Sequence, residues 1–198
     1  MKYRLTSLLL FGLMLTAAPA LAQGLIHDEA VDGDLSDGGT TPTSFVFGLG
    51  TNTIQGTLGP STGGTGATNG SSDADFFTFT LGAGQTITSF STTRSGPGTQ
   101  TFVGYSNSGA ISAISAAGLD GGDLFTNAST LAPTGDPSLG PIPTTFGAGD
   151  HTFIFQETGA GPIEYSATFT VAQVVPEPSS AALLGGLAMV GFIRRRRR

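Results

Sequence analysis

The sequence predicts an all-β domain, a sandwich or jelly roll of short antiparallel strands, with an N-terminal signal helix and a C-terminal transmembrane helix outside it. Three observations support this fold class. Polar and apolar residues alternate in short runs across residues 23–174, clusters rich in Gly and Pro separate the runs, and no helical stripe of apolar residues interrupts them. Twelve of the 14 phenylalanines lie in this stretch, so they are expected to form the core of the sandwich.

Residues 1–22 have the pattern of a secretory signal peptide. Lys2 and Arg4 precede the apolar run LTSLLLFGLMLTAA, and Ala20 and Ala22 supply the small residues of a cleavage site. We therefore expect cleavage after Ala22 and export of the remaining chain. An uncleaved membrane anchor is the alternative.

Two runs near the middle of the chain show the strand alternation most clearly. SFVFGLG and DFFTFTLGAGQTITSFS each place large apolar residues on one face. In the second run, residues 82–84 (GAG) are expected to turn the chain into a further strand that contains Ile87. The residues that share a face are Phe45, Phe47 and Leu49 in the first run, and Phe77, Phe79 and Leu81 in the second.

The last strong strand signal is GDHTFIFQETGAGPIEYSATFTVAQ, which predicts a β-hairpin across ETGAGP. Phe153 and Phe155 on its first arm are expected to pair with the second arm, and His151 shares their face at the edge of the core. TFVGY and AISAI are shorter candidate strands. The matching face of the second arm consists of Tyr165, Ala167, Phe169 and Val171.

Charge is divided sharply along the chain. Residues 23–178 contain all 14 acidic residues and one cation, Arg94, which gives this stretch a net charge of −13. A body this acidic does not neutralise phosphates, so nucleic acid is excluded as a partner. Cysteine is absent, which excludes disulfides and thiolate metal sites. Five cations end the chain: Arg194, Arg195, Arg196, Arg197 and Arg198.

No motif of a known enzyme class stands in its expected context in the body. The string GPSTG at residues 59–63 matches G-x-S-x-G but belongs to a Gly-rich stretch that is expected to be a surface loop, and nothing in the sequence places a histidine beside it. H-E-x-x-H does not occur, and the only histidines are His27 and His151. Paired carboxylates of a glycoside hydrolase remain an alternative, because residue counts give no separations. Against it, the chain has no Trp and its body has one Arg. We therefore expect a protein that is not an enzyme and needs no cofactor, with calcium as a candidate ligand.

Carboxylates gather in DEAVDGDLSD, which contains Asp28, Glu29, Asp32, Asp34 and Asp37 within ten residues. Hard oxygen ligands at alternating positions suit calcium, although the glutamate that ends an EF-hand loop is missing. The alternative is a solvated acidic arm. Asp73 and Asp75 precede the central strand, where they either cap a turn or join a metal site with Asp120 and Asp123. The candidate calcium ligands are Asp28, Asp32, Asp34, Asp37, Asp73 and Asp75.

Residues 175–198 form a separate unit with the sequence VPEPSSAALLGGLAMVGFIRRRRR. Residues 179–193 lack charge and would form a helix of about 22 Å, which is short for a membrane span. The arginines that follow can extend to the headgroups, and they predict that the tail stays in the cytoplasm while the body is exported. The prolines at 176 and 178 predict an extended, exposed segment before the helix.

This C-terminal unit resembles the PEP-CTERM protein-sorting signal of Gram-negative bacteria. The resemblance rests on Pro176, Glu177 and Pro178, the short apolar helix and the terminal arginine cluster. It implies recognition and cleavage by an exosortase-type membrane enzyme, frequently in organisms that make exopolysaccharide. A plain C-terminal tail anchor is the alternative.

The body itself resembles the pre-peptidase C-terminal (PPC)-like β-sandwiches of bacterial exported proteins. The resemblance is carried by DEAVDGDLSDGG, GLGTNTIQGTLG, DADFFTFTLGAGQTITSF and GDHTFIFQETG followed by EYSATFTV. His151 departs from the tyrosine-rich ending of that family. The likeness implies a domain with a binding role and no catalytic activity.

Together these observations predict an exported, non-enzymatic protein that begins as an inner-membrane-anchored precursor and reaches the cell surface or the extracellular matrix. Its expected partners are an exosortase-type enzyme, the membrane through residues 179–193, and exopolysaccharide. The alternative is a calcium-dependent, glycan-binding β-sandwich module.

Overall fold

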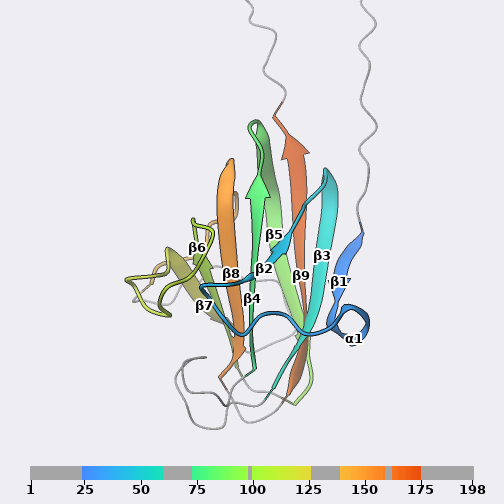
Figure 1. The fold of residues 1–198 in the computed structure, drawn as a ribbon, viewed down its shortest axis with the longest axis vertical. Helices are drawn as coiled ribbons and strands as arrows, with labels where there is room; N and C mark the ends of the chain where they lie inside the picture. The colour runs from blue at the N-terminus through green and yellow to red at the C-terminus, as the bar shows by residue number, and fades with distance from the viewer. Residues whose placement is uncertain (1–23, 60–72, 98–99, 126–138, 159–161, 175–198) are drawn as a thin grey trace, which may run out of the picture.

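The computed structural model describes residues 24–59, 73–97, 100–125, 139–158 and 162–174. These residues form nine strands and one short helix, arranged as two facing sheets (Figure 1). The predicted signal peptide and the predicted helix at 179–193 lie outside the described residues. The elements are β1 (Leu25–Asp28), α1 (Glu29–Asp32), β2 (Thr43–Phe45), β3 (Gly50–Leu58), β4 (Ala74–Leu81), β5 (Gln85–Ser95), β6 (Thr101–Ser106), β7 (Gly121–Phe125), β8 (Gly149–Glu157) and β9 (Ile163–Gln173).

The two sheets have the strand orders β1-β3-β9-β5 and β2-β4-β8-β6-β7, which confirms an all-β sandwich. The expectation that all strands are antiparallel is wrong at two places, because β1 pairs with β3 and β2 pairs with β4 in parallel. In both cases a stretch of about 20 residues or more separates the partners, which is long enough for a parallel connection. The acidic arm and the segment after it thereby add one edge strand to each sheet.

The predicted hairpin between β8 and β9 is wrong, although both strands exist. β8 lies between β4 and β6 in one sheet, whereas β9 lies between β3 and β5 in the other. Their apolar faces meet across the interior, where the rings of Phe155 and Tyr165 stack with centroids 4.4 Å apart. Alternation with a period of two fixes which face of a strand is buried. It does not distinguish a hairpin within one sheet from a connection between two sheets.

The segment AISAI, at residues 110–114, does not form the expected strand. The Ile111 amide donates to the Gly39 carbonyl, and Ile111 belongs to a small apolar cluster with Phe76, Phe102 and Ile154. This cluster lies on the outer side of β4, β6 and β8. The apolar residues of the segment therefore cover a sheet face and do not extend the sheet.

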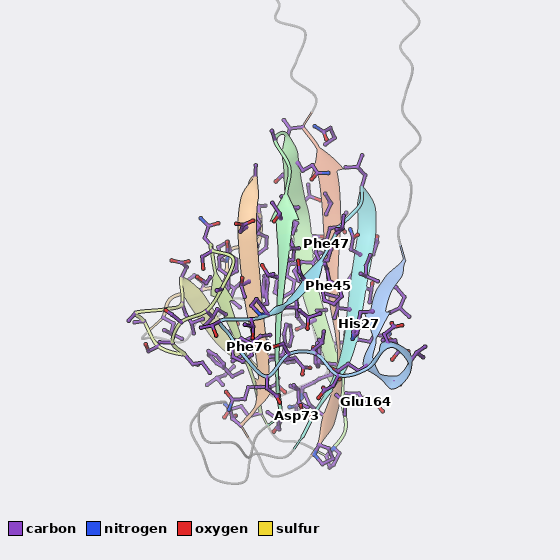
Figure 2. All side chains as sticks on the ribbon, in the orientation of Figure 1. His27, Phe45, Phe47, Asp73, Phe76 and Glu164 are labelled. Atoms are coloured by element: carbon purple, nitrogen blue, oxygen red, sulfur yellow. The ribbon has the colours of Figure 1, made fainter. Side chains whose placement is uncertain are left out.

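Phenylalanine fills the interior, as the sequence predicts. Phe77, Phe79, Phe153, Phe155 and Phe169 are each at most 1% exposed, and their rings stack or meet edge to face. Burial of each such side chain contributes roughly 1.5–3 kcal/mol. The end of β2 and the residues after it add two further rings to this core, Phe45 and Phe47, which are labelled in Figure 2.

The single cation of the body is buried inside the sandwich. Arg94 on β5 reaches Glu157 on β8 with an N–O distance of 3.4 Å, and the two side chains are 7% and 0% exposed. Thr101 on β6 hydrogen-bonds to both of them. A buried ion pair of this kind joins the two sheets, and it leaves the described surface without an arginine or lysine.

Candidate functional site

The acidic arm folds back onto β3 through a single glutamate. Asp28 caps the one-turn helix α1 by accepting from the Ala30 amide, and Glu29 is the first residue of that helix. The Glu29 carboxylate accepts from the Leu35 amide at 3.0 Å and from the Thr57 amide at 2.6 Å. These bonds fix the carboxylate beside the start of β4.

Asp75 on β4, a strand of the facing sheet, brings a second carboxylate into the core. The alternation in ADFFTFTL places Asp75 on the same face as Phe77, Phe79 and Leu81, so the strand that supplies the phenylalanine core also buries this acid. Asp75 is 0% exposed, and neither of its carboxylate oxygens has a hydrogen-bond partner. A buried charge without a partner costs several kcal/mol, so this carboxyl is a site of high energy in the fold.

Burial is the main cause of a large pKa shift at Asp75, and the nearby Glu29 carboxylate adds to it. Together they raise the pKa of Asp75 to about 9. The Tyr165 hydroxyl lies close enough to favour the ionised form, but the contact lacks hydrogen-bond geometry, so the carboxyl remains without a partner. Burial also raises the pKa of Tyr165. The site therefore holds a proton at neutral pH unless a cation replaces it.

Gly56 on β3 provides the space in which these two side chains meet. A Cβ atom at this position would lie 2.6 Å from the Tyr165 hydroxyl and 2.7 Å from an Asp75 carboxylate oxygen. Such distances are shorter than van der Waals contact. The glycine therefore permits the aromatic ring and the buried carboxyl to pack against β3.

Glu29, Asp34 and Asp75 form one carboxylate cluster. One oxygen from each lies within 4.8 Å of the others, and among the described residues this is the group of acidic or histidine side chains that could hold a metal ion. Burial is also the main cause that raises the pKa values of Glu29 and of Asp73 nearby. Burial and mutual repulsion both oppose full ionisation here, and a divalent cation would relieve both.

The other predicted calcium ligands have structural contacts. Asp32 accepts from the Asp28 amide, Asp37 from the Ala74 amide and Asp73 from the Gly59 amide. Asp73 lines the same surface depression as Glu29 and Asp34, so it stands at the entrance to the cluster. Of the six predicted ligands, the structure brings Asp34 and Asp75 together, places Asp73 beside them, and leaves Asp28, Asp32 and Asp37 outside the cluster.

Asp120 and Asp123 lie away from this cluster. Asp123 stands in the same row of the sheet as Asp75, but β8 and β6 separate the two strands, a distance of about 14 Å. Asp120 accepts from the Asn107 amide, just past the end of β6. The structure therefore does not join these residues to Asp73 and Asp75.

Glu29 was part of the acidic run in the sequence but was not among the predicted ligands. Its role depends on contacts with β3 and β4, which lie about 25 to 45 residues further along the chain. The available signal was the position of Glu29 between Asp28 and Asp34, and spacing alone does not show which of these side chains turns inward.

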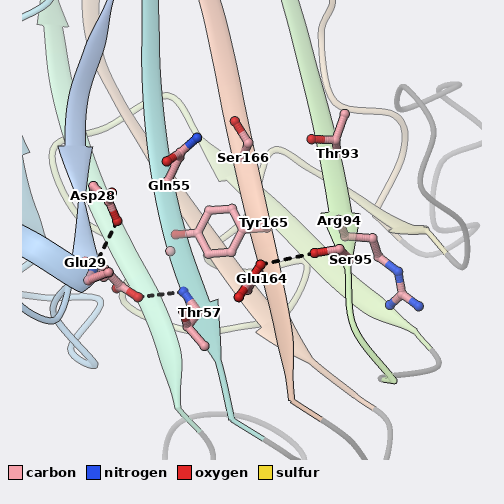
Figure 3. A pocket seen from close by; sticks show the side chains of 12 residues that line it. Asp28, Glu29, Gln55, Thr57, Thr93, Arg94, Ser95, Glu164, Tyr165 and Ser166 are labelled. Carbon is pink, nitrogen blue, oxygen red and sulfur yellow. Dashed lines mark hydrogen bonds between the residues drawn. The ribbon is translucent and has the colours of Figure 1, made fainter.

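A polar groove of roughly 380 Å³ runs beside the cluster on the outer face of β3, β9 and β5 (Figure 3). Glu164 on β9 lines the groove and accepts a hydrogen bond from the Ser95 hydroxyl on β5 at 3.3 Å. The outward side chains that line the groove are Gln55, Thr57, Thr93, Ser95, Glu164 and Ser166. This surface offers hydroxyl, amide and carboxylate groups. Tyr165 also borders the groove, but its ring stacks on Phe155 and is buried.

His151 has a structural role. It is 2% exposed, and its ring nitrogens lie 2.9 Å from the Tyr105 hydroxyl and 2.8 Å from the Gly147 carbonyl. Burial lowers its pKa, which keeps the ring neutral. The Nε2–H therefore donates to the carbonyl and Nδ1 accepts from the tyrosine. The prediction that His151 faces the core beside Phe153 is confirmed.

Comparison with known families identifies the end of the chain. A family model described as the PEP-CTERM protein-sorting motif matches residues 174–198. This chain carries a PEP-CTERM sorting motif. The motif includes Pro176, Glu177, Pro178 and the five terminal arginines, and it starts one residue before the predicted boundary.

The PEP-CTERM motif indicates export through membrane-associated sorting to the cell surface, and it implies an exosortase-type processing partner. No curated protein and no solved structure matches the chain. The likeness of the body to PPC domains therefore stays a prediction from sequence. Within the residues that the structure describes, no helix is long and apolar enough to cross a membrane.

The folded body of this PEP-CTERM protein extends to the first residue of the motif. β9 ends at Gln173, and the Val174 amide donates to the Gly84 carbonyl at 2.6 Å. Val174 is thus still hydrogen-bonded to the turn between β4 and β5, while it is also residue one of the matched motif.

Proposed function

We propose that this chain is a non-enzymatic protein of the cell surface or extracellular matrix, whose β-sandwich is the cargo of the sorting motif. The proposal rests on one observation, that a motif for exosortase-type sorting directly follows a folded body. In this proposal residues 179–193 anchor the precursor in the inner membrane. Processing near Pro176–Pro178 then releases or transfers the body, and exopolysaccharide is its surrounding polymer.

Mass spectrometry of the mature C-terminus from native cells tests this proposal. A terminus near residues 175–179 supports processing and release. An intact Arg198 in the membrane fraction would instead identify a permanent anchor. Substitution of Pro176, Glu177 and Pro178 together by alanine should leave the full-length precursor in the membrane, whereas substitution of Thr93, on the surface of the body, should not.

A second function is supported by the buried Asp75 carboxylate. We propose that Glu29, Asp34 and Asp75 bind a divalent cation, with calcium as the ion of choice because all three offer hard oxygen ligands. Asp75 is fully buried with two unpartnered oxygens, and a bound cation would satisfy them. The bound cation would tie the acidic arm to β4, since Glu29 and Asp34 belong to the arm.

Calorimetric titration of the body with calcium, together with its melting temperature, tests the second function. A free calcium concentration of one hundred times Kd would raise the free energy of unfolding of the body by about 2.7 kcal/mol. Absence of both heat and a melting-temperature shift at millimolar calcium would refute it. Magnesium serves as the matched control ion, because it demands a stricter octahedral geometry than a three-carboxylate cluster supplies.

A further inference from the structure

The end of the sandwich that carries Val174 differs from the opposite end in its charge. Its tip consists of the turn between β4 and β5 and the end of β9, where Gly82, Ala83 and Gly84 are exposed and uncharged. Gln85 and Gln173 pair beside the turn. This tip stands at the top of Figure 1, where β9 ends beside the β4–β5 turn.

The carboxylates lie mainly in the other half of the molecule. The candidate cation cluster, Glu157 and Glu164 are all at the far ends of β4, β8 and β9, as the labels of Asp73 and Glu164 in Figure 2 show. Asp120 and Asp150 are the described acids nearer the tip, and Asp150 accepts a hydrogen bond from the Thr80 hydroxyl at 2.6 Å. The described carboxylates are thus concentrated in the half of the sandwich away from the sorting motif, with Asp120 and Asp150 as the exceptions.

The distance from this tip to the membrane is limited by chain length. Val174 is the last residue that the structure describes and is hydrogen-bonded to the body, and the uncharged run begins at Ser179, five residues later. An extended chain spans at most about 3.6 Å per residue, so these five steps reach at most about 18 Å. Headgroups occupy roughly 5–8 Å on each side of the hydrocarbon layer, which leaves about 10 Å between the tip and the lipid surface.

We propose that the anchored precursor stands end-on at the bilayer, with the β4–β5 turn and the end of β9 against the lipid headgroups. This inference rests on the proposed anchor at residues 179–193. Chain length brings the tip to the membrane, and charge selects the orientation, because anionic headgroups repel the carboxylate-rich half of the body. Side-on contact would bring Glu164 and the acidic arm to the lipid.

Orientation can be measured with single labels, since the natural chain contains no cysteine. Ala83→Cys places a fluorophore on the exposed tip, and Thr93→Cys places it on an exposed position of β5. Thr93 lies opposite Ser166, eight residues from Val174 along β9, which corresponds to about 27 Å. Full-length protein is reconstituted in vesicles of phosphatidylethanolamine and phosphatidylglycerol that carry a headgroup quencher.

End-on contact predicts that quenching at Ala83 exceeds quenching at Thr93 several-fold. A flexible insert of about twenty Gly and Ser residues after Val174 is the matched control, because it adds a root-mean-square reach of about 25 Å and should abolish the difference. Equal quenching at the two sites, or stronger quenching at Thr93, overturns the orientation. Flotation of the vesicles separates the two proposals: protein that does not float overturns the anchor and the orientation together, whereas floating protein with equal quenching overturns the orientation alone.

Discussion

Replacement of Asp75 by asparagine is the sharpest test of the cation site, because it changes one buried carboxyl to a neutral group of the same shape. In the wild-type protein the pKa of Asp75 is raised to about 9, so at pH 7 a cation must displace a proton to bind. Two pKa units correspond to about 2.7 kcal/mol. About 1% of the Asp75 carboxyls are ionised at pH 7 and about half at pH 9, so the calcium affinity of the wild-type protein should rise about 50-fold between these pH values if one proton leaves per cation.

Without calcium, the Asp75 carboxyl should make the folded protein less stable as the pH rises, whereas calcium affinity should increase with pH. The folded protein holds the Asp75 proton up to about pH 9, whereas the unfolded chain loses it near pH 4. The free energy of unfolding should therefore fall by up to about 1.4 kcal/mol per pH unit across this interval. Asp75→Asn removes that slope, so in chelator at pH 8 the variant should be at least as stable as the wild-type protein.

The measurement is calcium titration calorimetry at pH 7, 8 and 9, with urea unfolding in chelator alongside. Asp123→Asn is the matched control, since Asp123 is also a buried acid in the same sheet row but lies outside the cluster. The cation site at Asp75 would be refuted if Asp75→Asn bound calcium as tightly as the wild-type protein does. It would also be refuted if the calcium affinity of the wild-type protein did not change between pH 7 and pH 9.

Three further changes test the packing around the site by urea unfolding of the body. Gly56→Ala should cost about 1–3 kcal/mol through overpacking against Tyr165, and an unchanged midpoint would show that the ring can move away. Phe77→Ala should cost about 3–5 kcal/mol, against almost nothing for the exposed Val46→Ala; similar losses in both would contradict the assigned core. Arg94→Met should cost about 3–5 kcal/mol at neutral pH because it leaves a buried glutamate without its cation, and a neutral result would mean that the ion pair is replaceable.

The sequence predicted the faces of the strands better than their partners. Phe77, Phe79 and Leu81 alternate with polar residues, and all three point into the core. The same alternation in β8 and β9 does not show that the chain changes sheets between them. Pairing depends on contacts between distant residues, and the local pattern does not contain this information.

β3 was not predicted as a strand, although it is fully formed. Its inward positions include Asn52 and Gly56, which interrupt the apolar alternation. Asn52 is buried because its side chain bonds to the amide and carbonyl of Gly48 and to the carbonyl of Gly50. A buried side-chain amide that hydrogen-bonds to the backbone occupies an inward position without being apolar, so a count of apolar residues misses it.

The candidate cation cluster was predictable in part. The abundance of acids near residue 30 and before β4 indicated hard oxygen ligands, and Asp34 and Asp75 do meet. The inward turn of Glu29 was not predictable, because it depends on the Thr57 amide of β3. Sequence spacing also does not distinguish an acid that accepts from a backbone amide, such as Asp28, from a buried acid without a hydrogen-bond partner, such as Asp75.

The central position of β9 has a consequence for the order of events during export. β9 is the last strand of the body, yet it lies between β3 and β5, so until β9 arrives β3 pairs only with β1 and β5 has no neighbour in its sheet. Pairings across such sequence separations close slowly. We therefore expect the four-stranded sheet to close only after β9 has emerged, immediately before the sorting motif, so that the chain would remain unfolded enough to be exported until then.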